Sequence, residues 1–295
     1  GRLTLQGAIR YDRAGSWFPE QQLGPTRFLP TPIVFPETKG VDSYNDITPR
    51  LGFAWDVFGD GRTALKGNLG RYLEGVGTSG IYASTNPTSR IPGGGGFSVG
   101  SVTRAWTDRD GDYHPDCDLL VPTEQNRNNP SADFCGTISN TRFGQNVLTN
   151  NFDPDLLHGW GVRPSDWSFN VSLQQQLLPR MSVEVAYARR TFSGFTVTDN
   201  LVVGRPEYTE YSVTAPSDPR LPNGGGHVIS GLLDLQPGLF GRVDNLITDS
   251  RNFGDWSQYF DGVDVTVSAR FRGGFTFQGG TGTGRTVGCA CGVRA

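Results

Sequence analysis

The chain has 295 residues, a formal net charge of −3 and a pI of about 5.6, and 36% of its residues are hydrophobic. A charge so near neutral, without a basic stripe, argues against a nucleic-acid-binding protein. No run of 18 apolar residues occurs, which excludes a membrane-spanning helix. A membrane barrel stays possible, because its strands are apolar only at alternate positions.

Alternating apolar and polar residues predict seven strands, since successive side chains of a strand point to opposite faces. The predicted strands lie near residues 3–11, 47–57, 63–73, 166–177, 181–190, 259–271 and 274–282. The segments 12–46, 74–164 and 191–257 between them are irregular and rich in proline or glycine, and are predicted to be long loops.

The clearest pair of strands runs from Ser165 to Arg190 and turns near Pro179. Its first strand has eleven residues from Trp167 to Leu177, and a strand that crosses a bilayer needs about 9–11. One face of the pair is apolar (Trp167, Phe169, Val171, Val183, Val185 and Tyr187), and the other is polar (Ser168, Asn170, Gln174 and Glu184). We expect the apolar face to contact lipid and the polar face to line a lumen.

Short and long connections alternate along the chain. The short turns, near Asp60, Pro179 and Gly273, all fall at one end of the strands, and the long loops all fall at the other. Outer-membrane barrels have this plan, with short periplasmic turns and long extracellular loops. The polar faces carry Arg50, Asp56, Lys66, Gln174, Glu184, Asp264 and Arg270, which suit a water-filled lumen better than a dry core.

The sequence thus predicts an all-β, antiparallel transmembrane β-barrel in the cell outer membrane. Seven strands is an odd number, and bacterial single-chain barrels have even numbers, so residues 1–295 are expected to form part of a larger barrel. The main alternative is a soluble β-sandwich or propeller that acts as an extracellular ligand-binding or glycan-binding module with a calcium loop.

Three runs of residues carry a family resemblance: Asp46–Gly75 (DITPRLGFAWDVFGDGRTALKGNLGRYLEG), Trp167–Arg190 (WSFNVSLQQQLLPRMSVEVAYARR) and Phe260–Phe271 (FDGVDVTVSARF). They resemble the barrel of TonB-dependent outer-membrane receptors, in particular the large Oar-like receptors that contain a carboxypeptidase-regulatory-like domain. The resemblance implies a barrel of about 22 strands with a plugged lumen. It also implies uptake energised by the TonB complex, through a plug that would precede Gly1.

Aspartates cluster in one of the long loops. Asp108, Asp110 and Asp112 have the alternate spacing of calcium-binding loops, and the cluster continues to Asp116 and Asp118. Such carboxylates can surround one hard cation, so a structural Ca²⁺ that stiffens an extracellular loop is a hypothesis here. The EF-hand pattern is not met, because Leu119 stands where that loop has its glutamate. A solvated acidic loop is the other interpretation.

All four cysteines fall in segments assigned to the extracellular side, where disulfides persist. Cys117 with Cys135 is the simplest pair. Cys289 and Cys291 are too close in sequence for an easy mutual bond, and pairing beyond this chain is the expectation for them.

Enzyme motifs are absent from the sequence. It holds three histidines, none in HExxH, and no GxSxG elbow, so we expect no catalytic residues and no other cofactor. The expected activity is binding and gated passage of an unidentified small molecule, oligosaccharide or peptide. Aromatic residues of the loops are the candidate ligand contacts, namely Trp106, Tyr113, Trp160 and Trp256.

Overall fold

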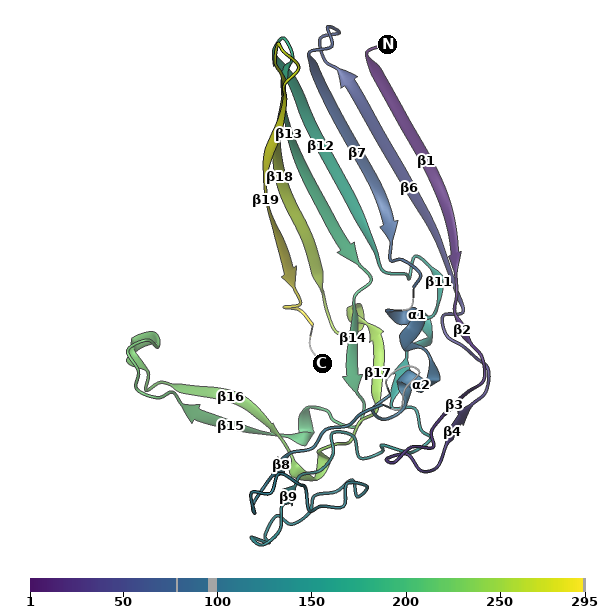
Figure 1. Cartoon of the computed structure of the whole chain (residues 1–295), viewed down its shortest axis with the longest axis vertical. Helices are drawn as coiled ribbons and strands as arrows, with labels where there is room; N and C mark the ends of the chain where they lie inside the picture. The colour runs from purple at the N-terminus through teal and green to yellow at the C-terminus, as the bar shows by residue number, and fades with distance from the viewer. Residues whose placement is uncertain (78, 95–99, 294–295) are drawn as a thin grey trace.

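The computed structural model describes residues 1–77, 79–94 and 100–293. Its main feature is one sheet of seven long antiparallel strands, which occupies the upper half of Figure 1. In spatial order these are β1 (Leu3–Ala14), β6 (Ser43–Asp56), β7 (Thr63–Leu73), β12 (Ser165–Leu178), β13 (Met181–Ser193), β18 (Ser257–Arg270) and β19 (Thr276–Cys289). The predicted antiparallel all-β fold is therefore confirmed. A short strand, β11 (His158–Trp160), adds parallel to the start of β6.

The register of the sheet places odd-numbered residues of all seven strands on one face and even-numbered residues on the other. One odd-numbered row across the sheet reads Leu3, Trp55, Leu65, Leu173, Val185, Val265 and Thr281. This face is largely apolar and exposed, with Leu5 72% and Ile9 80% accessible. A continuous apolar band of this kind is the surface that a membrane barrel presents to lipid.

At its loop end, the apolar band gives way to a cluster of polar and aromatic side chains on the same face. Asp261 accepts a hydrogen bond from the Tyr187 hydroxyl (2.6 Å) and forms an ion pair with Arg189 (3.3 Å). The Arg189 guanidinium also lies over the ring of Tyr259, 4.6 Å from its centroid. Aromatic and polar side chains at this level are typical of the interface between the hydrocarbon and the aqueous side.

The even-numbered face is polar and shallow. Lys66 bonds Gln174 (2.6 Å) and lies 3.7 Å from Glu184, so three neighbouring strands share one polar group. Many side chains of this face are small, and its even-numbered glycines and alanines are Ala8, Ala14, Gly52, Ala54, Ala64, Gly70, Ala186, Ala188, Gly262, Gly280, Gly282, Gly284 and Gly288. Hollows of about 750 and 480 Å³ lie against this face.

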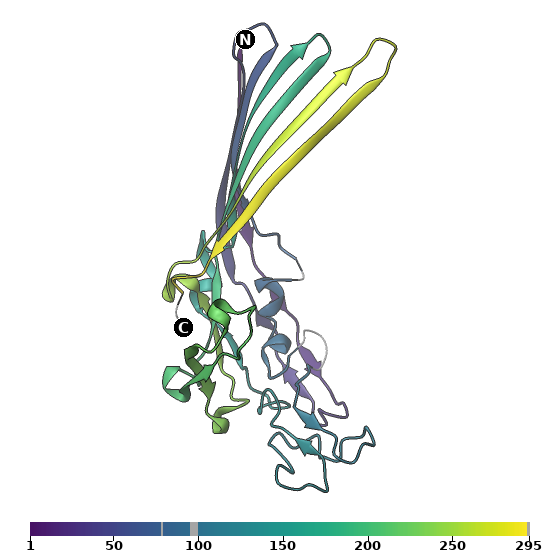
Figure 2. The same cartoon turned by 90° about the vertical axis from the view of Figure 1, so that its left-hand side faces the viewer.

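The connections divide as predicted between the two ends of the sheet. Three short turns, at 57–62, 179–180 and 271–275, lie together at the top of Figure 1, and Figure 2 shows the same hairpin turns from the side. Every long connection lies below. Asp56 organises the first turn by accepting hydrogen bonds from the backbone N–H groups of Gly59 (2.8 Å) and Gly61 (2.9 Å).

Several strands run further toward the loops than the alternation indicates. β1 and β6 stay paired through Ala14 and Tyr44, and β19 reaches Cys289 instead of residue 282. The extensions are polar or glycine-rich, so they lack a period-two apolar pattern, and backbone pairing with the neighbouring strand holds them.

The predicted loops also contain small elements of their own. The short strands are β2 (Trp17–Phe18), β3 (Gln21–Leu23), β4 (Ile33–Phe35), β5 (Thr38–Lys39), β8 (Trp106–Thr107), β9 (Phe134–Cys135), β10 (Asn150–Phe152), β14 (Thr196–Asn200), β15 (Tyr208–Thr214), β16 (Val228–Leu235) and β17 (Asn245–Asp249). The helices are α1 (Ile81–Ser84) and α2 (Pro87–Arg90), with 3-10 turns at Pro154–Leu156, Arg205–Glu207, Pro222–Gly224, Pro237–Leu239 and Ser250–Asn252.

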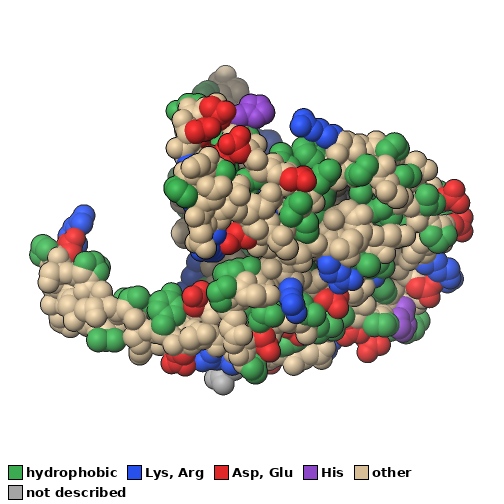
Figure 3. All heavy atoms as spheres, turned by 90° about the horizontal axis from the view of Figure 1, so that it is seen from below, with side chains coloured by type: hydrophobic (Ala, Val, Ile, Leu, Met, Phe, Trp, Pro, Cys, Tyr) green, Lys and Arg blue, Asp and Glu red, His purple; other side chains and the backbone are tan. Residues whose placement is uncertain are grey.

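Most of the buried apolar residues lie among these loops, and on the sheet only Tyr44 of β6 and Ala269 of β18 are buried among the described residues. One cluster contains Leu23, Leu29, Ile33, Phe35 and Ile91. The other contains Val41, Tyr44 and Tyr82 and sits where the loops meet the strands. The loops therefore form a packed assembly at one end of the seven-stranded sheet, which we call the wall. The β15–β16 hairpin is the exception and projects away from this assembly in Figures 1 and 3.

The sheet does not match the soluble alternative. A β-sandwich needs a second sheet packed on the first, and in the described residues the next largest sheet has three short strands, β10, β17 and β14. Nor is the barrel closed within this part of the chain, because β1 and β19 each pair along one side only. Among the described residues, no helix has the length and apolar character needed to cross a membrane.

Candidate ligand site at the loop end of the sheet

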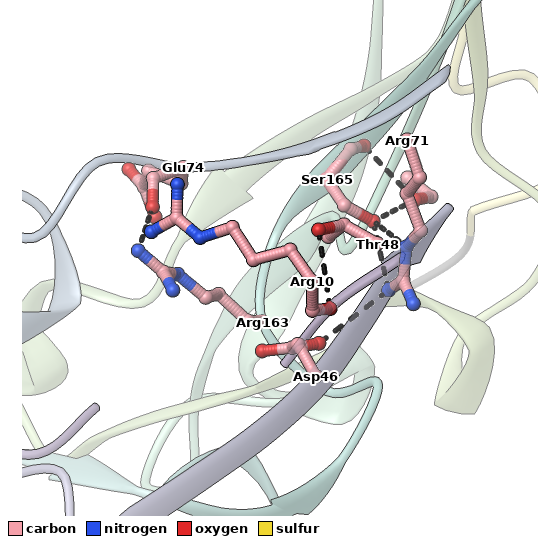
Figure 4. Close-up of polar contacts among 8 residues, drawn as sticks. Arg10, Asp46, Thr48, Arg71, Glu74, Arg163 and Ser165 are labelled. Carbon is pink, nitrogen blue, oxygen red and sulfur yellow. Dashed lines mark hydrogen bonds and ion pairs between the residues drawn. The ribbon is translucent and has the colours of Figure 1, made fainter. Parts of the chain in front are cut away.

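A polar cluster lies where β6 and β7 separate. The two strands pair from Arg50–Gly70 to Asp56–Ala64, and below that level β6 pairs with β11. The Arg71 side chain, just past the last pair, donates to the Ser165 hydroxyl (3.1 Å) and lies 3.6 Å from an Asp46 carboxylate oxygen, as Figure 4 shows. Three strands are joined in this way at the loop end of the sheet.

Asp46 is the buried anion of this cluster. It is 1% exposed, and neither of its carboxylate oxygens has a hydrogen-bond partner among the described residues. Its charge is balanced by Arg71 through an ion pair without a close hydrogen bond. A buried carboxylate with so little direct bonding is costly and is kept only where neighbouring cations offset it.

Arg163 approaches the same place from the loop before β12. It is 6% exposed, and it donates through Nη2 to the backbone carbonyl oxygen of Glu74, while its Nε has no partner among the described residues. Its guanidinium lies 5.8 Å from the ring of Tyr82, which packs edge-on against Tyr44. Burial raises the pKa of Tyr82, so this hydroxyl stays neutral and the local charge comes from the arginines.

A hollow of about 380 Å³ opens beside this cluster. Its lining comes from β1, β6, β7 and the segments that follow, namely Arg10, Asp12, Arg13, Ala14, Thr48, Arg50, Arg71, Tyr72, Leu73, Gly75, Val76 and Arg163. Arg10 pairs with Asp12, whereas Arg50 lies over the Tyr72 ring, 4.8 Å from its centroid, without a carboxylate partner in the described part of the chain. Sequence reasoning singled out Arg50 only as a lumen residue and missed the others, because the arginines come from four separate segments.

The predicted calcium residues are brought together only in part. Carboxylate oxygens of Asp108, Asp110 and Asp133 lie within 4.8 Å of one another, and Asp112, Asp116 and Asp118 stand outside this group. The Asp112 backbone N–H bond lowers the pKa of Asp110, but burial and the neighbouring negative charges outweigh it, so the pKa is raised overall. Calcium binding stays a prediction, and Asp133, which the sequence pattern missed, is its additional candidate ligand.

Asp133 also organises the loop around it. It is fully buried and accepts hydrogen bonds from the Arg109 backbone N–H (2.8 Å), the Trp106 indole N–H (2.9 Å) and the Asp116 backbone N–H (3.4 Å). The first two bonds lower the pKa of its carboxyl group below the usual range. The ionised form is therefore the one that holds the loop.

The stability of this loop is expected to depend on pH through Asp133. A depressed pKa in the folded loop means that its contribution is fully present above the unfolded value of about 3.9 and is lost as pH falls through the folded value. Hydrogen exchange of residues 103–140, corrected for intrinsic rates, should show the loop opening as pH falls below about 4. Asp133→Asn should open the loop already at neutral pH, and the exposed Asp112→Asn should change little; equal profiles for the two variants would contradict this role.

The structure joins the cysteines in two pairs. The sulfurs of Cys117 and Cys135 lie 2.08 Å apart and close a segment with a sequence separation of 18. Cys289 and Cys291 also pair, contrary to the sequence expectation, because the chain turns at the end of β19 and brings their Cα atoms to 5.2 Å. That separation lies within the range that a disulfide spans.

The four aromatic residues predicted to contact ligand do not meet. Trp106 is held by Asp133, and Tyr113 is 86% exposed at a loop tip. Trp160 packs beside Tyr11, with ring centroids 5.9 Å apart, and Trp256 stacks on Phe195 at 5.0 Å. Tyr11 and its hydrogen-bond partner Asn45 belong to the odd-numbered face, so Trp160 lies at the interface level of the outer wall.

Comparison with known proteins supports the architecture. A family model described as an outer membrane beta barrel domain matches residues 1–280. No curated protein gave a significant match to the sequence. The match covers nearly the whole chain, and it agrees with the apolar outer face, the polar inner face and the one-sided loops described above. The chain belongs to the family of outer membrane beta barrel domains, and its location is the outer membrane.

Proposed function

We propose that this chain forms part of the wall and the ligand-capturing loops of a TonB-dependent receptor. The observation that carries the proposal is the packed assembly of long loops at one end of a sheet whose inner face is polar. A pore for passive exchange needs little more than a wall, whereas folded loops above a polar lumen suit selective capture followed by passage. The proposed activity involves no bond chemistry.

The open edges of the sheet support a larger barrel. β1 has 12 residues and β19 has 14, and in the described residues each leaves one side unpaired. Unpaired backbone groups within hydrocarbon cost several kcal/mol each, so open edges do not occur in the membrane. We propose that further strands close the barrel and that a plug fills its lumen, in line with the resemblance to Oar-like receptors.

Energised uptake is the property that separates a TonB-dependent receptor from other barrels. The proposed partners are the TonB complex, which acts through the plug, and the lipid around the wall. The ligand would be captured by the loops and released into the lumen when the plug moves.

The proposal is tested by uptake in cells that express the full-length protein. Cells are given a mixture of small solutes, and the solutes accumulated in an expressing strain are compared with those in a deletion strain. Accumulation that depends on the protein and stops when a protonophore collapses the inner-membrane gradient supports the proposal. Accumulation that continues without the gradient contradicts it and indicates a passive pore.

A further inference from the structure

The hollow at the mouth of the lumen has an excess of positive charge. Its lining residues include five arginines, namely Arg10, Arg13, Arg50, Arg71 and Arg163, and one acidic residue, Asp12. This leaves an excess of four positive charges. Counting also the buried Asp46 beside Arg71, and Glu74, whose backbone carbonyl accepts from Arg163, still leaves an excess of two.

Some arginines of the hollow have no carboxylate partner among the described residues. Arg50 has no ion-pair partner in the described part of the chain, and its guanidinium is oriented by the Tyr72 ring. Arg163 is 6% exposed, and its enclosed Nε has no partner among the described residues, so this arginine adds positive charge beside the hollow without offering Nε to a ligand. Positive charge that is not paired with a carboxylate is stabilised by an anion, and charge-assisted hydrogen bonds are the strongest that a guanidinium makes.

From this geometry we propose that the hollow binds a small organic anion with at least two carboxylate or phosphoryl groups. Planar guanidinium groups present two parallel N–H donors, a geometry that matches both kinds of oxyanion. The volume of about 380 Å³ fits a small molecule and is too small for a folded partner. The position, between the loops and the polar inner face, is where a captured ligand would enter the lumen. This inference rests on the proposed receptor function and names its ligand class.

A second occupant of the hollow is an acidic segment of the same protein, such as a plug residue that reaches the wall. The small anion is favoured because the hollow opens at the loop end and not midway along the wall, where Lys66 is already neutralised by Glu184. Binding measurements on the full-length protein decide between the two, since an internal acidic segment would exclude added anions.

The test titrates the full-length protein in detergent micelles with citrate, with pyrophosphate and with glucose as a neutral probe, followed by calorimetry. At least one anion should bind, glucose should not, and affinity should fall as salt concentration rises. Arg50→Gln should weaken binding about tenfold, because it removes one charge-assisted contact, and Arg50→Lys should recover part of the loss. Arg50 makes no side-chain hydrogen bond within the described residues, so its replacement is expected to leave the fold intact.

Arg189→Gln is the matched control. It removes an arginine that lies at nearly the same level along the strands as Arg50, but on the outer face of β13. Citrate binding alone points to a carboxylate ligand, and pyrophosphate binding alone points to a phosphorylated one. If neither anion binds, or if Arg50→Gln and Arg189→Gln have equal effects, the anion site is overturned. Energised uptake without anion binding would support the receptor function and refute only this ligand class. Anion binding without energised uptake would support the anion site and refute the receptor function.

Discussion

Replacement of Val185 by arginine is expected to block stable insertion of the sheet into the membrane. Val185 lies on the odd-numbered face, between Leu173 and Val265 in the apolar row, and is 44% exposed. An arginine on the lipid face near the middle of a barrel wall costs about 2–4 kcal/mol. Refolding of the full-length protein into lipid vesicles, followed by urea titration, should show this loss of stability.

Ala186→Arg is the matched control for that substitution. Ala186 is the next residue of β13 and points to the opposite face, in a row with Lys66, Ser172 and Asp264. An arginine there stays in the polar lumen beside an aspartate, so little stability should be lost. Equal destabilisation by the two substitutions would show that the odd-numbered face is not the lipid face.

Loss of the Cys117–Cys135 disulfide is expected to unfold the loop that it closes while the wall stays intact. Cross-linking across a separation of 18 residues removes chain entropy worth about 3 kcal/mol in the unfolded loop. Strands β8 and β9, which this disulfide adjoins, have only two residues each and cannot hold the loop alone. Trypsin should then cleave within residues 103–140 of the Cys117→Ala, Cys135→Ala variant under conditions in which the parent protein resists.

The second disulfide gives the comparison for this experiment. Cys289 and Cys291 are two positions apart at the end of β19, with one residue between them, so their bond constrains little chain. The Cys289→Ala, Cys291→Ala variant should therefore keep the parent protease pattern in residues 103–140. Cleavage of that loop in both variants would show that general destabilisation, and not loss of the local cross-link, exposes it.

The wall was predictable from sequence because one physical rule governs it. A strand between lipid and water must alternate apolar and polar side chains, so Trp167, Phe169 and Val171 on one side and Ser168 and Asn170 on the other already defined the two faces. The rule weakens where lipid ends, and there the predicted strand ends fell short, as at Tyr11 in β1. It also fell short for β19, which was predicted to end near residue 282 and reaches Cys289, because its glycines and threonines carry no apolar period.

The candidate site was not predictable in the same way. Arg10, Arg50, Arg71 and Arg163 are far apart in sequence, and no local pattern relates them; they meet because β6 and β7 separate at Arg50–Gly70 and leave a gap. Side-chain type alone indicated the loop aromatic residues as ligand contacts, and packing places them in four different surroundings. Asp133 escaped notice because it is a single aspartate, and its role depends on three donors that the fold brings to it.

The small side chains of the inner face have a consequence for movement. Interlocking of side chains is what makes two packed surfaces resist sliding, and the glycine-rich and alanine-rich parts of this face, between its charged side chains, offer few projections to interlock. At Gly262 and Gly284 the ring of Phe260 lies so close that an added Cβ would approach it to 2.8 and 2.7 Å, so even this aromatic side chain lies flat against the sheet. If a plug fills this lumen, as proposed above, it would slide past these parts of the wall with little loss of packing.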